Sequence, residues 1–147
     1  MATTLLNAIP GTTAMYTAAQ ADAQFVTKRT TITGIDGTST GTTNILTGAG
    51  GVTTFVTKVI VRLTAISGGA GNGRYPKLGF GIAAGEDDII APVKIQGVLV
   101  ANQDIWEFNL EGKTINVPAA SVMKLGIDNA SNSTTYTISV DALYYEI

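Results

Sequence analysis

Three carboxylates surround the only tryptophan of the chain, and paired carboxylates are the groups with which many enzymes cleave glycosidic bonds. Asp104 and Glu107 lie three positions apart on either side of Trp106, and Glu111 follows them. In a β-strand, side chains three positions apart project to opposite faces, so Asp104 and Glu107 could not flank one bond directly. We therefore interpret the carboxylates as solvated charges near strand ends and Trp106 as a core residue.

The side chains that most often act as nucleophile or general base are missing. The chain contains 0 Cys and 0 His, which removes thiolates, imidazoles and the commonest zinc ligands. A nucleophile or base would have to come from a hydroxyl, a lysine, a tyrosine or a carboxylate tuned by burial. We predict a protein that is not an enzyme, with no catalytic residue, no cofactor and no resident metal.

Two other stretches resemble ligand sites in composition alone. Glu86, Asp87 and Asp88 offer the oxygen ligands that calcium prefers, but they lack the alternate spacing of an EF-hand loop. We interpret them as an acidic exposed turn. The glycine-rich segment 68–73 resembles a phosphate-binding loop, yet no Lys-Ser/Thr pair follows it, and Pro76 stands where a helix should begin. A flexible connection is the better interpretation.

The charge balance excludes some classes of partner. The chain has 9 Lys and Arg against 11 Asp and Glu, a net charge of −2, and no basic run. A nucleic-acid partner is therefore not expected, because such binders carry a basic footprint. No stretch approaches the roughly 20 apolar residues of a membrane-spanning helix, and residues 1–23 lack the pattern of a signal peptide. We expect no membrane partner and folding in a cytoplasm.

The surface is expected to be covered in part by other chains. Only 14% of the residues are charged, against about 25% in ordinary soluble domains. Mean hydropathy is nevertheless +0.27. Because monomers seldom leave large apolar patches in water, we predict contacts with other copies or with another protein.

The segment 52–66 decides the fold class, because its apolar residues fit two periods. A helical period places on one stripe Val56, Val59, Ile60, Leu63 and Ile66. A strand period places on one face Phe55, Val59, Val61, Leu63 and Ala65. Most of the segment is Val, Ile or Thr, whose branched side chains favour strands. We predict a strand with Phe55, Val59, Val61 and Leu63 inward, and Ile60 on the outward face between Lys58 and Arg62.

The rest of the chain repeats this alternation with turn residues between the runs. Apolar residues alternate in segments 78–82, 106–110, 123–127 and 136–144. This pattern is typical of an all-β sandwich or barrel, and 147 residues fit one domain. We predict a single-domain antiparallel β-sandwich over residues 24–147.

Residues 1–23 form a separate, N-terminal arm in this interpretation. Small residues and Thr dominate, and the apolar residues are scattered: Leu5, Leu6, Ile9, Met15 and Tyr16. Two alternatives remain open, namely a frayed terminus and an extended arm that docks on a neighbouring subunit.

Several stretches together resemble the jelly-roll virion proteins of tailed bacteriophages. They are the small-residue arm, FVTKVIVRLTAIS, KLGFGIAAGEDDIIAP and the closing TYTISVDALYYEI, and the resemblance covers roughly residues 50–147. This class includes capsid decoration (cement) proteins, head-fibre modules and tail-fibre modules. The resemblance implies a trimeric jelly-roll sandwich on the outside of a particle, with arms that clasp neighbouring capsid subunits.

The resulting hypothesis is a non-enzymatic decoration protein that binds the outside of a phage head and stabilises it, with assembly in the host cytoplasm. Its partners would be the major capsid protein or another virion protein, and two further copies of itself. The predicted interface residues are Leu5, Leu6, Ile9, Met15, Tyr16, Ile60, Leu143, Tyr145 and Ile147. The alternative is a receptor- or glycan-binding fibre module that uses the loop residues Asn72, Arg74, Tyr75, Asp87 and Asp88.

Overall fold

Strands make up almost all the regular structure of residues 26–82, 87–110 and 115–147, the ranges that the computed structural model describes. They are β1 (Lys28–Asp36), β2 (Gly41–Thr47), β3 (Thr54–Ser67), β4 (Lys77–Gly81), β5 (Ile90–Lys94), β6 (Ile105–Asn109), β7 (Asn116–Val117), β8 (Val122–Asn129) and β9 (Thr135–Glu146). A single 3-10 turn, η1, spans Gly71–Arg74. The all-β prediction is confirmed. The predicted arm, residues 1–23, lies outside the described ranges.

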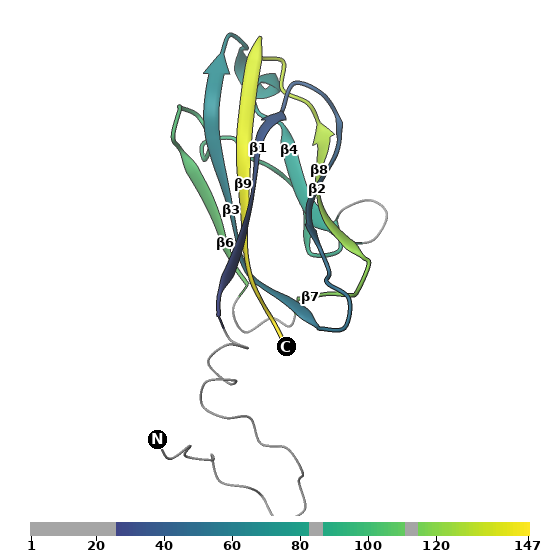
Figure 1. Ribbon diagram of the computed structural model, residues 1–147. Helices are drawn as coiled ribbons and strands as arrows, with labels where there is room; N and C mark the ends of the chain where they lie inside the picture. Colours follow the sequence, from purple (N-terminus) through teal and green to yellow (C-terminus); the bar gives the residue numbers. More distant parts are fainter. Residues whose placement is uncertain (1–25, 83–86, 111–114) are drawn as a thin grey trace, which may run out of the picture.

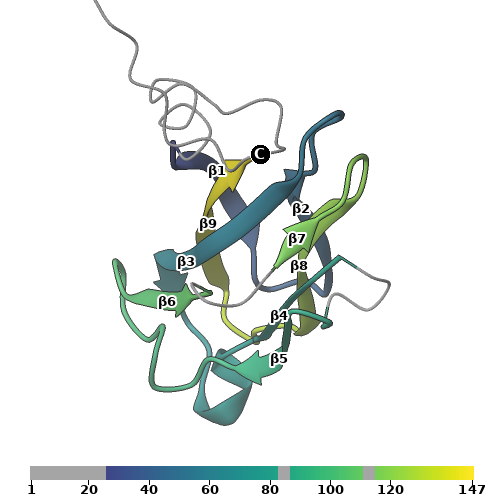
Figure 2. The ribbon, with the colours of Figure 1, turned by 90° about the horizontal axis from the view of Figure 1, so that it is seen from below.

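The strands form two antiparallel sheets that pack face to face (Figures 1 and 2). One sheet has the order β1-β9-β3-β6, with the short β7 paired to the start of β3, and the other has the order β2-β8-β4-β5. No helix in the described part of the chain is long and apolar enough to cross a membrane.

The pairing scheme is that of a jelly roll. With β7 set aside, each strand of the first half pairs with its counterpart counted from the end: β1 with β9, β2 with β8, β3 with β6, and β4 with β5. A long hairpin folded over on itself produces such nested pairs. The pairs β3–β9 and β4–β8 then join them into two sheets. The predicted jelly-roll-like sandwich is therefore confirmed.

The core lies between the sheets and draws on every long strand. Phe80 of β4 is fully buried and meets Phe108 of β6 edge-on, with ring centroids 5.9 Å apart. Trp106 packs against Phe108 and is partly buried against the same core, as its alternation predicted. The fully buried aliphatic side chains include Val59, Val61, Leu63, Leu78, Leu125, Ile138 and Val140.

Strand β3 carries two bulges, and they explain its ambiguous sequence pattern. The register with β9 shifts between Val56 and Lys58, and again between Leu63 and Ala65. The extra residues are Thr57 and Thr64, whose hydroxyls donate to carbonyl oxygens of β9 at 3.2 and 3.0 Å. Each bulge reverses the alternation of side chains.

The inward set of β3 therefore has a spacing of three, two, two and three. Its members are Val56, Val59, Val61, Leu63 and Ile66. The prediction for Phe55 was wrong, because the bulge at Thr57 turns Phe55 to the outward face and Val56 to the core. The prediction that Ile60 faces outward is confirmed, since Ile60 is half-buried between the fully buried Val59 and Val61.

Candidate interface surfaces

The outer face of the β1-β9-β3-β6 sheet carries Ile60, Leu143 and Tyr145, three of the predicted contact residues. Along β9, Leu143 and Tyr145 alternate with core residues, and along β3 the partly buried Ile60 does the same. Across the strands, Ile60 lies opposite Asp141 and Glu107. We call this surface the paired face and define it by Arg29, Phe55, Lys58, Ile60, Arg62, Glu107, Asp141, Leu143 and Tyr145.

Asp141 is the electrostatic centre of the paired face. Only 5% of the residue is exposed. The guanidinium of Arg29 donates to both carboxylate oxygens, at 3.0 and 2.7 Å, and the Thr31 hydroxyl donates at 2.6 Å. Burial by itself raises the pKa of Asp141, but these hydrogen bonds and the charges of Arg29 and Arg62 outweigh it, so the net pKa lies below its usual value.

The other described ion pairs also join strands within the sheet. Lys58 of β3 meets Glu107 of β6 at 2.7 Å, and Lys28 of β1 pairs with Glu146 of β9. Charges that are matched within one face create little net field around it. A partner therefore does not need to compensate the charges of these pairs, and the apolar side chains between them are left to provide contacts.

Apolar side chains gather at one end of the paired face, the apolar end, beside the Lys28–Glu146 ion pair. Tyr145 stacks on Phe55 with ring centroids 5.2 Å apart and an interplanar angle of 22°, and Ile147 exchanges two backbone hydrogen bonds with Thr53. Val26, Val52 and Ile147 are exposed by 56, 37 and 43%. Figure 2 looks onto this end, where β1 begins and β9 ends. Tyr145 and Ile147 were predicted as contacts, whereas Val26, Val52 and Phe55 were not.

The predicted contact residues of the arm are not placed relative to the paired face. They are Leu5, Leu6, Ile9, Met15 and Tyr16, and all lie outside the described ranges. The described part of the chain begins at Val26, shortly before β1. The arm is therefore attached at the apolar end of the paired face.

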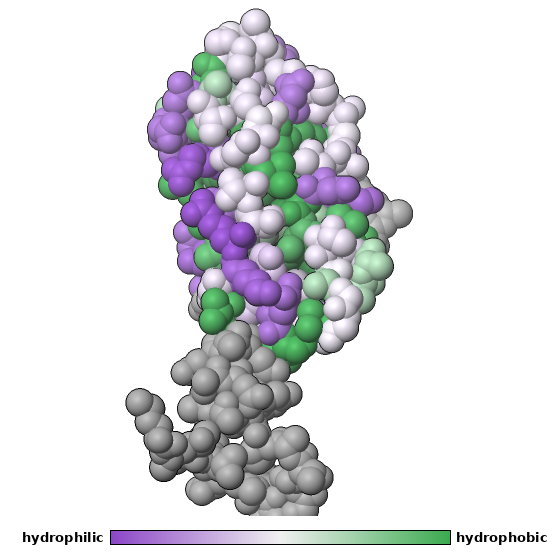
Figure 3. Space-filling view, in the orientation of Figure 1, coloured by the Kyte–Doolittle hydropathy of each residue, from purple (hydrophilic) through white to green (hydrophobic). Residues whose placement is uncertain are grey.

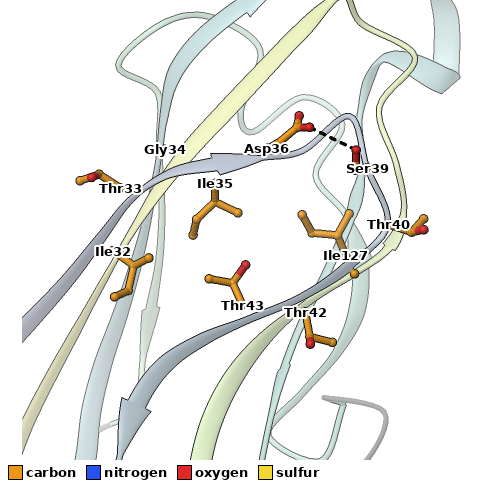
Figure 4. A pocket seen from close by; sticks show the side chains of 11 residues that line it. Ile32, Thr33, Gly34, Ile35, Asp36, Ser39, Thr40, Thr42, Thr43 and Ile127 are labelled. Carbon is orange, nitrogen blue, oxygen red and sulfur yellow. Dashed lines mark hydrogen bonds between the residues drawn. The ribbon is translucent and has the colours of Figure 1, made fainter.

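Two hollows flank the beginning of β2: the first is lined by β1 and β2, and the second by β2, β8 and Pro92 of β5. The first has a volume of about 330 Å³ and lies between the two strands. Figure 4 shows Ile35, Thr43 and Ile127 pointing into it, while Thr33 points away. The second also measures about 330 Å³ and shares Thr40, Gly41, Thr42 and Ile127 with the first. Figure 3 shows apolar surface running down the middle of the face in view, between more polar flanks.

The carboxylate of Asp104 accepts hydrogen bonds from backbone N–H groups of its own loop. Asp104 accepts hydrogen bonds from the N–H groups of Val100 and Ala101 at 2.8 and 2.7 Å, which closes the loop before β6. Glu107 faces outward in its pair with Lys58, so Asp104 and Glu107 do not share a cleft. Glu111 lies outside the described ranges.

Asp88 and Tyr75, two residues of the alternative receptor-binding site, make contacts within the sandwich. Asp88 accepts the backbone N–H of Ile82 at 2.6 Å, and Glu86 lies outside the described ranges. Tyr75 is partly buried against the core. Within the described ranges, no three acidic residues converge to form a metal site.

Comparison with known proteins shows what the chain is similar to. A chain in the acidic stable capsid structure of Helicobacter pylori bacteriophage KHP30 superposes with a TM-score of 0.59 at 15% identity, over 84% of this chain and 93% of that one. A chain of the cyanophage Pam1 capsid asymmetric unit superposes with a TM-score of 0.52 at 13% identity, over 93 and 99%. At these identities the likeness shows the fold. No protein-family model and no curated protein matches the sequence.

Proposed function

We propose that the chain is a non-enzymatic structural protein of a tailed-phage virion, and specifically a decoration protein that binds the outside of the head and stabilises it. The observation that carries this proposal is the fold shared with chains of two phage capsid structures. The matches cover 93 and 99% of those chains and 84 and 93% of this one, so the chains are similar in length.

The paired face is the surface proposed to contact the major capsid protein. Arg29 is paired with Asp141 and Lys58 with Glu107 within the sheet, while Ile60, Leu143 and Tyr145 stand between these pairs. Interfaces combine such apolar and aromatic centres with a polar rim. A modest contact repeated over many copies on a lattice then gives strong total binding, because the linked contacts reinforce one another.

Association into a homotrimer is part of the same proposal. The low charge content and the exposed Val26, Val52 and Ile147 support it, since an isolated small domain rarely leaves such side chains in water. Threefold closure would cover them without leaving an open-ended chain of contacts. The arm, residues 1–23, is proposed to contact neighbouring subunits through its five apolar residues.

Immunogold labelling of purified particles of the phage that encodes the chain tests the location. The proposal predicts label over the whole head surface, and saturable binding when the purified protein is added to particles that lack it. Label confined to tail or fibre tips, with binding on a glycan array, would favour the fibre module instead. A chain absent from the particles would contradict both.

A further inference from the structure

We propose that the two hollows beside β2 form one groove that receives the N-terminal arm of a second copy of this chain, in extended form. The groove is defined by the lining that both hollows share, Thr40, Gly41, Thr42 and Ile127, together with Ile35 on one side and Pro92 on the other. This proposal concerns contacts between copies, and it stands independently of whether the copies bind a phage head.

The geometry of the groove suits an extended polypeptide. The hollows lie on either side of the first residues of β2, and a Cβ added to Gly41 would have no atom within 4 Å. A segment can therefore pass over Gly41 from one hollow to the other without a clash. A cavity of about 150 Å³ holds one benzene ring, so each hollow has room for about two apolar groups of that size.

The chemistry of the groove disfavours acidic ligands, so the segment that fills it should carry no carboxylate. Ile35 and Ile127 form an apolar floor, threonines form the walls, the exposed Asp128 stands at the second hollow, and no lysine or arginine is among the described lining residues. The carboxylate of Asp36 is occupied by the backbone N–H and hydroxyl of Thr38, at 2.9 and 2.6 Å, and by the Ser39 hydroxyl at 3.1 Å. An apolar, threonine-compatible segment is the best match.

The arm has this character. Residues 1–21 contain no charged side chain, and Thr and small residues surround the apolar ones. In an extended segment Leu5 and Ile9 project to the same face, about 13 Å apart. Pro10 also restricts Ile9 to extended backbone conformations. Leu5 and Ile9 are therefore the two side chains that we assign to the groove.

The position of the arm selects a second copy as its source. The arm joins the sandwich before Lys28, whereas the groove adjoins the other end of β1, about 25 Å away along the strand. To fill its own groove, the chain would have to reverse direction immediately before β1. Between Gly11 and β1, Asp22 is the only residue of a type that tight turns favour. An extended arm instead leads away from its own groove and toward a neighbour's.

Cross-linking tests the proposal cleanly, because the natural chain has 0 Cys and each introduced thiol is unique. A tagged full-length Ala8→Cys chain is co-expressed with an untagged Thr42→Cys chain, and the purified protein is treated with a short bis-maleimide. The matched control replaces the second chain by Thr47→Cys, an exposed site on the same strand beyond the hollows. We expect the tagged–untagged product with Thr42→Cys to exceed the control several-fold.

Two further variants separate the groove from general association. Leu5→Asp with Ile9→Asp should remove the cross-link, as should Thr42→Arg in the receiving chain tested through Thr40→Cys, whereas Thr47→Arg should leave it. Equal products at the two strand positions would overturn the groove as the site. A cross-link within one diluted chain carrying both Ala8→Cys and Thr42→Cys would overturn the second copy as the source. No product with either partner would overturn the proposal altogether.

Discussion

The two sheets resemble each other toward the core and differ on their outer faces. Inward, both present fully buried aliphatic and aromatic side chains. Outward, the β1-β9-β3-β6 sheet carries long side chains that pair across the strands. The β2-β8-β4-β5 sheet instead places Gly126 between Thr42 and Gly79, and Gly81 beside Lys124. The shared inner faces account for the fold, and the outer faces carry what is particular to this chain.

The largest losses of stability are expected from substitutions on the inner faces, where the two sheets are alike. Phe80→Ala in β4 should lower the free energy of unfolding by about 3–5 kcal/mol and Leu63→Ala in β3 by about 2–5 kcal/mol, because each leaves a cavity in a closely packed core. Chemical denaturation measures both. A loss well below 1 kcal/mol at either position would show that the sheets do not share one cooperative core.

The next effect tests the electrostatics of the paired face. Asp141→Asn should lower the free energy of unfolding at pH 7 by about 1–3 kcal/mol, because the hydrogen bonds from Arg29 and Thr31 lose their charged acceptor. The matched control is Asp128→Asn, on the outward side of β8, which should change stability by no more than about 0.5 kcal/mol.

The pH dependence follows from the direction of the Asp141 pKa. The folded-state pKa of Asp141 lies below its usual value in an unfolded chain, so the unfolded chain takes up the proton first as pH falls. The contribution of Asp141 is therefore complete above the unfolded pKa and is lost as pH falls through the folded pKa. Acid titration of unfolding should show a smaller loss in Asp141→Asn than in the natural chain. An equal loss would contradict the assigned role.

A smaller effect is expected at the bulges that distinguish β3. Thr57→Val and Thr64→Val each remove a hydroxyl that donates to β9, and should cost about 0.5–1.5 kcal/mol. Thr47→Val, on exposed β2 surface, serves as the control. If all three variants unfolded at the same denaturant concentration, the threonine hydroxyls would not be what stabilises the bulges.

The smallest change in stability is expected for a substitution that should clearly weaken binding to phage heads. Ile60→Thr on the paired face and Val93→Thr on the other sheet remove similar exposed or partly exposed aliphatic groups, and each should alter stability by less than about 1 kcal/mol. Only Ile60→Thr should weaken co-sedimentation with phage heads. Equal binding by both variants would remove the paired face from the proposed contact.

The sequence predicted the sandwich because alternation survives in most strands, as in Met123, Leu125 and Ile127 of β8. It failed at Phe55, where an inserted threonine reverses the alternation. The three-residue steps at Val56–Val59 and Leu63–Ile66, which mimic a helix, are themselves the signal of bulges. A strand-rich composition combined with two helix-like steps could have indicated them.

The outward direction of Ile60 could be predicted from alternation, whereas its surroundings could not. Arg29 and Asp141 are 112 positions apart, and only the pairing of β1 with β9 brings them together. Val26, Val52 and Ile147 likewise converge because β1 begins, and β9 ends, beside the start of β3. Contacts between residues so distant in the sequence depend on the strand topology, which local sequence patterns do not encode. The interface role of these residues stays a prediction.

Sedimentation equilibrium of the purified chain over a wide range of concentration tests most directly whether its apolar surface is covered by other copies. We predict a closed assembly with the mass of three chains. A single chain at every concentration, freely soluble and without self-association, would contradict it.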